Sequence, residues 1–164
     1  MGKENGFAYQ VLVLIIIIVI AIAGVIINKI IGKDGVLNKV AEVETEYSKA
    51  DVLEKINYVV TQKFIEINNE AKASNRNISE LYNSNVVIEF LKQNLMIEET
   101  YDENGNFQEG IYHINIGKLK DEEKEIQYVG KFQLEKKDDK YVVVWYNEKN
   151  HSEEVGELQI QQTI

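Results

Sequence analysis

The sequence predicts an α+β protein in which a long N-terminal helix packs under a small C-terminal antiparallel sheet. Three observations lead to this prediction. An unbroken apolar run occupies Val11–Ile27, apolar residues then recur every three or four positions from Leu37 to Ala71, and an alternating pattern begins after Met96. Recurrence every three or four residues is typical of an amphipathic helix, whereas alternation is typical of a strand.

The apolar run indicates a transmembrane helix over Phe7–Ile31. Its central part, Val11–Ile27, contains no polar side chain. About 20 helical residues, rising 1.5 Å each, cross a hydrocarbon core of about 30 Å. A lone spanning segment must be helical, because only then are all its backbone groups bonded internally. Ala21-Ile22-Ala23 leaves open a cleaved secretory signal, whose mature product would begin at Gly24.

Residues 32–73 are predicted to continue the spine as an amphipathic helix. Gly32 and Gly35 each cost about 1 kcal/mol inside a helix, so we expect a bend or a local break there. Two arrangements remain open: one continuous spine, or an anchor joined by a short linker to a separate amphipathic helix. The residues expected on the apolar face are Leu37, Val40, Val43, Tyr47, Ala50, Leu53, Ile56, Val60, Phe64, Ile67 and Ala71.

Residues 74–164 are predicted to form an α+β head domain that begins with two short helices. Asn77, with Glu80 three residues later, resembles a capping pair and predicts a helix that starts at Ile78. A second helical piece is expected over Val86–Leu95, with one side formed by Val87, Phe90, Leu91 and Leu95.

Three to five antiparallel strands should follow these helices. Asn104-Gly105 is a strong hairpin signal, and Lys136–Lys140 is expected to form a polar turn between the two longest strands. Tyr141–Tyr146 should form a strand that buries both faces. The remaining strands are expected from the alternation of Tyr112, Ile114 and Ile116, of Ile126, Tyr128, Phe132 and Leu134, and of Leu158 and Ile160.

The distribution of charge argues against nucleic-acid binding. Of the 18 basic and 27 acidic side chains, only three and one respectively lie in the first 33 residues, so residues 34–164 carry a formal charge of −11. Binding DNA or RNA requires Lys and Arg to replace counterions on phosphates. The same excess of carboxylates argues against a domain that lies on an anionic membrane surface.

The leader and the apolar helix resemble the class III signal of type IV pilins and pseudopilins. Residues 1–6, Met-Gly-Lys-Glu-Asn-Gly, are a short charged leader that ends in Gly6 directly before Phe7. The resemblance implies that prepilin peptidase cuts between Gly6 and Phe7 and that the new amine of Phe7 is methylated. It also implies a C-terminal domain outside the cytoplasm. Val11 stands where the family usually has Glu, so that carboxylate's ion pair with a neighbouring subunit is not expected here.

No catalytic or metal-binding motif emerges from the remaining sequence, and no cofactor is expected. His113 falls in a strand pattern and His151 in a polar turn, without the spacing of a zinc site. Asp102, Asn104 and Asn106 loosely resemble a calcium loop, but the twelfth position is His113 rather than Glu, which favours a hairpin turn. The chain has no cysteine, which excludes disulfides and thiolate sites.

The expected function is that of a non-enzymatic structural subunit of a type IV pilus-like filament or a type II secretion pseudopilus. Its expected partners are the membrane, prepilin peptidase and other pilin-like subunits, with assembly through the N-terminal apolar helix. The alternative is a single-pass membrane-anchored protein whose exported domain binds a ligand or a partner. A membrane-tethered enzyme has no supporting motif.

Overall fold

The structure is a computed structural model that describes residues 15–23, 26–27, 29–30, 32, 35–119 and 128–160. The chain divides into two compact units, Met1–Glu44 and Thr45–Ile164. The expected leader, residues 1–6, and the first part of the expected transmembrane helix, residues 7–14, lie outside the described residues.

The amphipathic pattern forms one helix of 39 residues, α2 (Val36–Ser74). The chain bends at Gly32 and Gly35, where the Gly35 N–H donates to the Gly32 carbonyl at 2.6 Å, as the two glycines predicted. At the other end Asn75 adopts a φ of 51°, a left-handed conformation that asparagine tolerates at helix ends. The Arg76 N–H then donates to the Ala71 carbonyl at 2.9 Å and closes the helix.

Two short helices follow, α3 (Ile78–Leu81) and α4 (Ser84–Gln93). Asn77 caps α3 as predicted, because its side chain accepts a hydrogen bond from the Ser79 N–H at 3.1 Å. The prediction that Leu95 belongs to the second helix is wrong. Leu95 has a φ of 56° and is 55% exposed, because α4 ends at Gln93 and the chain reverses there.

Five antiparallel strands form one sheet whose spatial order is the order of the chain. The turn signal at Asn104-Gly105 is confirmed, since it joins the first strand to the second. The turn expected over Lys136–Lys140 does join the third strand to the fourth, but only Asp138 and Asp139 lie outside the strands, and the second strand, with 8 residues, is longer than these two, with 7 each. The strands are β1 (Ile97–Tyr101), β2 (Phe107–Ile114), β3 (Lys131–Lys137), β4 (Lys140–Tyr146) and β5 (Ser152–Glu157).

Three expectations about the strands are wrong. Ile116 begins a short helix, α5 (Ile116–Leu119), and Tyr128 precedes β3. The last strand is β5 rather than the segment around Leu158 and Ile160, which follows it. The sequence of β5, Ser-Glu-Glu-Val-Gly-Glu, has no apolar alternation, and for that reason it was not predicted as a strand. This edge strand is held in the sheet by backbone pairing with β4. Ile126 lies outside the described residues.

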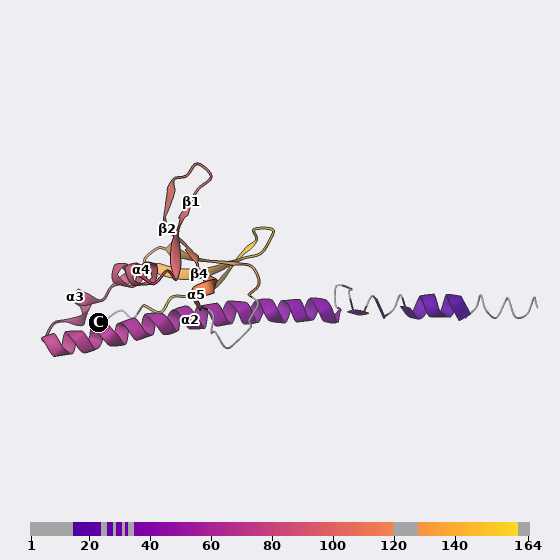
Figure 1. The fold of residues 1–164 in the computed structure, drawn as a ribbon, viewed down its shortest axis with the longest axis horizontal. Helices are drawn as coiled ribbons and strands as arrows, with labels where there is room; N and C mark the ends of the chain where they lie inside the picture. The colour runs from indigo at the N-terminus through magenta and orange to yellow at the C-terminus, as the bar shows by residue number, and fades with distance from the viewer. Residues whose placement is uncertain are drawn as a thin grey trace, which may run out of the picture. The chain divides into compact units, whose positions relative to one another are not determined.

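The core of the second unit lies between α2 and the sheet (Figure 1). Residues one helical turn apart on α2 are fully buried, and they belong to one apolar cluster with residues of the sheet and of α4. Consecutive residues Tyr141–Val144 of β4 are buried, which confirms that this strand buries both faces. The central members of the core are Val52, Ile56, Val60, Leu91, Ile97, Ile114, Phe132, Leu134 and Val143.

Candidate functional site

The residues predicted to be processed, Gly6 and Phe7, lie outside the described residues, as does Val11. The described part of the apolar run is helical over residues 15–23. Among the described residues, no helix combines the length and the apolar character that crossing a bilayer requires. The large apolar side chains exposed in this run are Ile15, Ile16, Ile17, Ile18, Val19, Ile20, Ile22, Ile26, Ile27 and Ile30, with exposed fractions from 42% to 65%.

A second group of exposed apolar side chains lies at the start of α2. We refer to Val36, Leu37, Val40 and Val43 as the N-terminal stripe of α2, and all four are exposed. Three of them line an open groove of about 290 Å³, together with Lys39 and Glu44. Contiguous apolar side chains on a protein surface mark sites of contact with a partner or with lipid.

The apolar character of α2 is interrupted at Ser48, which is fully buried. The Val129 N–H donates to the Ser48 hydroxyl oxygen at 3.3 Å, and the Trp145 indole N–H donates to the Val129 carbonyl at 2.8 Å. Gly130 has a φ of +86°, and a Cβ atom there would lie 2.2 Å from the Trp145 indole nitrogen. Only glycine therefore allows the chain to pass this close to the Trp145 ring.

Lys49 is the other buried polar residue among those described, with 5% of its surface exposed. Its ammonium donates to carboxylates of Glu46 and Glu153, each at 2.7 Å, and lies 4.6 Å from the centre of the Trp145 ring. Burial lowers the pKa of Lys49, but the hydrogen bonds to Glu153 and Glu46 outweigh burial and leave the pKa raised. Lys49 is therefore a stable cation that ties α2 to the last strand.

A further polar group joins α2 to the segment that precedes β3. The Lys55 ammonium lies 3.1 Å from the Asp51 carboxylate and donates to the Tyr128 hydroxyl at 3.0 Å, while that hydroxyl donates to Asp51. Burial lowers the pKa of Lys55, but the hydrogen bonds to Tyr128 and Asp51 outweigh burial and leave this pKa raised. The pKa of Tyr128 is also raised, by burial and by its hydrogen bond to Asp51. Both shifts favour the protonated forms of Lys55 and Tyr128, which are the forms that donate the hydrogen bonds of this group.

These contacts form what we call the polar junction, which attaches α2 to the sheet. We interpret the polar junction as an attachment, because every charge in it is paired with an opposite charge or with a hydrogen-bond partner. Its members are Glu46, Ser48, Lys49, Asp51 and Lys55 of α2, with Tyr128, Val129, Gly130, Trp145 and Glu153.

The loosely calcium-like sequence forms the β1–β2 turn, as its hairpin interpretation predicted. The Asp102 carboxylate accepts hydrogen bonds from the backbone N–H groups of Asn104 and Asn106, which hold the turn closed. These hydrogen bonds lower the pKa of Asp102, and the bond from the Asn106 backbone N–H has the largest effect. No group of three or more His, Asp or Glu side chains in the described ranges is arranged to hold a metal ion.

The two histidines lie apart in the head. His113 is half-buried in β2, and His151 is exposed between β4 and β5, where its ring lies 3.4 Å from the Asn147 amide nitrogen. Neither ring therefore joins the polar junction.

The polar junction could not be found in the sequence, because its members come from four separate segments: α2, residues 128–130, β4 and β5. The apolar spacing predicted Tyr47 and Ala50 on the buried face, whereas both are exposed and Ser48 and Lys49 are buried instead. The one usable signal was Val52, which lies four residues before Ile56 and extends the true face.

No known family model matches the sequence, and no curated protein or solved structure was found to be similar to it.

Proposed function

We propose that this chain is a membrane-anchored structural subunit of a pilin-like filament, either a type IV pilus-like fibre or a type II secretion pseudopilus. The observation that carries the proposal is the run of exposed isoleucine and valine side chains over residues 15–30. A bilayer would cover these side chains before assembly, and the equivalent helices of neighbouring subunits would cover them in the filament. The Gly6-Phe7 boundary supplies the processing site.

The architecture of the head supports the proposal at the level of fold class. A long helix over an antiparallel sheet is the arrangement that the pilin resemblance implies. The polar junction attaches α2 to the sheet through paired charges, which suits a helix that must carry a head domain in an assembly. In this function the head lies outside the cytoplasm and displays its acidic surface.

The test is mass spectrometry of the N-terminus of the native protein, isolated from cells that possess prepilin peptidase. The proposal requires a chain that begins at methylated Phe7. A chain that begins at Met1 would instead indicate a simple anchor, and one that begins at Gly24 would indicate a cleaved secretory signal. Either of these results would overturn the proposal.

A matched pair of leader variants makes the test specific. Gly6→Asp places a charged side chain at the cleavage site, so we expect the uncleaved chain to accumulate. Gly2→Asp introduces the same charge in the same leader, away from the cut, and should be processed like the unaltered protein. Equal processing of the two variants would contradict cleavage after Gly6.

A further inference from the structure

The β1–β2 hairpin extends beyond the rest of the sheet (Figure 1). β2 pairs with β3 only over Ile111–His113, so Phe107–Gly110 have no strand partner on that side among the described residues. The pairing of β1 with β2 shifts between Glu99 and Tyr101, and Gly110 opposite has a φ of +80°. Such irregularities bend a hairpin and redirect its end.

The bend is fixed in position by close packing. A Cβ atom at Gly110 would lie 2.9 Å from the Lys136 Cβ atom of β3, so the backbone passes directly against its neighbour. Beyond the bend, the Asp102 carboxylate accepts hydrogen bonds from the Asn104 and Asn106 N–H groups at 2.9 and 2.8 Å. The hairpin is therefore a preorganised projection rather than a loose loop, and preorganisation favours binding.

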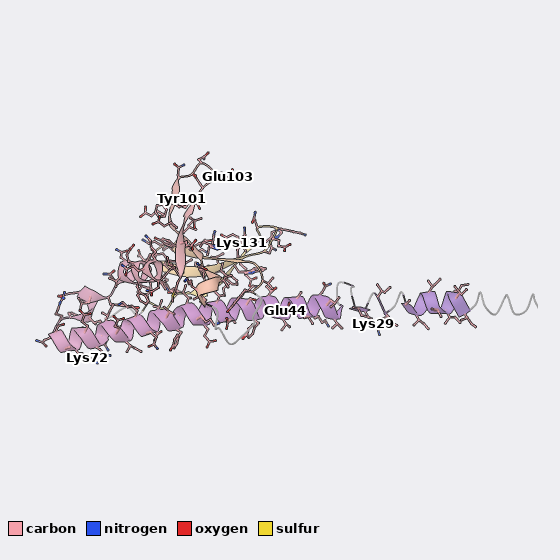
Figure 2. All side chains as sticks on the ribbon, viewed as in Figure 1. Lys29, Glu44, Lys72, Tyr101, Glu103 and Lys131 are labelled. Carbon is pink, nitrogen blue, oxygen red and sulfur yellow. The ribbon has the colours of Figure 1, made fainter. Side chains whose placement is uncertain are left out.

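The projection carries two exposed aromatic side chains. Tyr101 and Phe107 are cross-strand partners, and 56% and 45% of their respective surfaces are exposed. Figure 2 shows Tyr101 and Glu103 on the projecting hairpin. Their ring centres lie 6.1 Å apart with the planes tilted by 59°, so the two rings form one exposed aromatic pair. Aromatic side chains held rigidly on a surface are common centres of binding energy.

The hairpin that carries the two rings is acidic in its own sequence, and the nearby lysines come from other elements, Lys92 of α4 and Lys136 of β3. Residues 98–110 contain five carboxylates and no lysine or arginine. Glu99 pairs with Lys92 of α4 at 2.9 Å. Within the described part of the chain, no ion pair joins Asp102, Glu103 or Glu109 to a cation, and Glu103 and Glu109 are exposed.

We propose that this surface, which we call the hairpin tip (Tyr101, Phe107, Glu103 and Glu109), binds a protein segment that presents lysine or arginine side chains. A cation stacks on an aromatic face and pairs with nearby carboxylates, so both features of the tip select the same partner chemistry. Nucleic acid and anionic lipid are repelled by the carboxylates. Contact between the tips of two copies would bring like charges together. This inference does not depend on membrane anchoring or filament assembly.

The probe is a synthetic peptide with three arginines separated by glycines, and its control replaces each arginine with neutral citrulline. Both are titrated into the isotopically labelled full chain in a zwitterionic detergent at low salt, followed by nuclear magnetic resonance. The arginine peptide should shift signals of residues 99–109 selectively, and the citrulline peptide should not. Combined Tyr101→Ala and Phe107→Ala should weaken binding by about fivefold.

Matched variants separate the tip from general surface charge. Tyr58→Ala removes a ring that is 63% exposed on α2, and Glu148→Gln removes an exposed carboxylate from the β4–β5 turn, so neither should alter binding. Combined Glu103→Gln and Glu109→Gln should weaken binding severalfold. Equal effects of tip and control variants, equal binding of both peptides, or self-association that depends on Tyr101 would each overturn the proposal.

Discussion

Two parts of α2 carry the same kind of side chain and differ in what covers them. Val36, Leu37, Val40 and Val43 in the N-terminal stripe are exposed, whereas Val52, Ile56, Val60 and Ile67 are buried. Both groups repeat at helical spacing. Periodicity therefore determines that the segment is a helix with an apolar face, while burial depends on whether the sheet supplies partners. On α2 the polar junction begins at Glu46, after the stripe, and its last members, Asp51 and Lys55, flank the buried Val52.

The largest expected difference between the two parts is in the cost of truncating an apolar side chain. Ile56 is fully buried, so Ile56→Ala should lower the free energy of unfolding by about 4 kcal/mol through lost burial and a cavity. Leu37 is 55% exposed, so Leu37→Ala should cost less than about 0.5 kcal/mol. Denaturant unfolding followed by the fluorescence of Trp145, the only tryptophan, measures both. Similar costs would show that the stripe is packed as well as the core.

A somewhat smaller effect is expected where the chain passes the polar junction. Gly130→Ala should lower the free energy of unfolding by about 3 kcal/mol, because the backbone has a φ of +86° and the added Cβ meets Trp145. Gly105→Ala is a matched control with a φ of +79° but open space around the Cβ, so it should cost about 1 kcal/mol. If the two variants cost the same, close packing against Trp145 does not position this segment.

The ion pairs of the junction should contribute less than its packing. Combined Glu46→Gln and Glu153→Gln leaves the buried Lys49 ammonium without an anion, so the free energy of unfolding should fall by about 1–2 kcal/mol. Glu66→Gln disrupts an ion pair with Lys63 in which Glu66 is mostly exposed, and should cost close to nothing. An equal response to both changes would contradict the attachment role of Lys49.

The smallest effect concerns stability at alkaline pH. A hydrogen bond to Glu135 and burial raise the pKa of Tyr146 to about 12, and the pKa values of Lys49, Lys55 and Tyr128 are also raised. Above pH 10 the folded state therefore binds more protons than the unfolded state, so stability falls as pH rises.

Tyr146→Phe removes one of these groups and should make the decline between about pH 10 and 12 shallower. Urea unfolding at several pH values measures the slope. Tyr58→Phe, at a tyrosine that is 63% exposed, is the control. An unchanged slope in Tyr146→Phe would contradict the role of its hydrogen bond.

Sequence patterns predicted the elements that depend on local chemistry. α2, the Asn77 cap, the Asn104-Gly105 turn and the doubly buried strand over Tyr141–Tyr146 all follow from spacing or turn residues. β5 was misplaced because its strand character comes from pairing with β4, which no pattern within the segment records. Leu95 was misplaced because a left-handed leucine at a helix end has no sequence signature.

The candidate surfaces were predictable to different degrees. The apolar run is visible as composition, and its proposed processing depends on Gly6 and Phe7, outside the described residues. The polar junction joins Lys49 to Glu153 across 104 residues, a separation that single-sequence reasoning does not bridge. The hairpin tip was predictable in part, since the sequence predicted its turn but not the bend at Gly110.

The sheet has its strands in the order in which they are synthesised, so each hairpin can pair as soon as its second strand exists. The helix that covers the sheet does not share this advantage. Lys49 meets Glu153, and the Asn57 side chain accepts from the Gln159 N–H across 102 residues. The attachment of α2 to the end of the chain therefore forms only after the last strand has been synthesised, and until then part of the apolar face of α2 is open to non-native contacts.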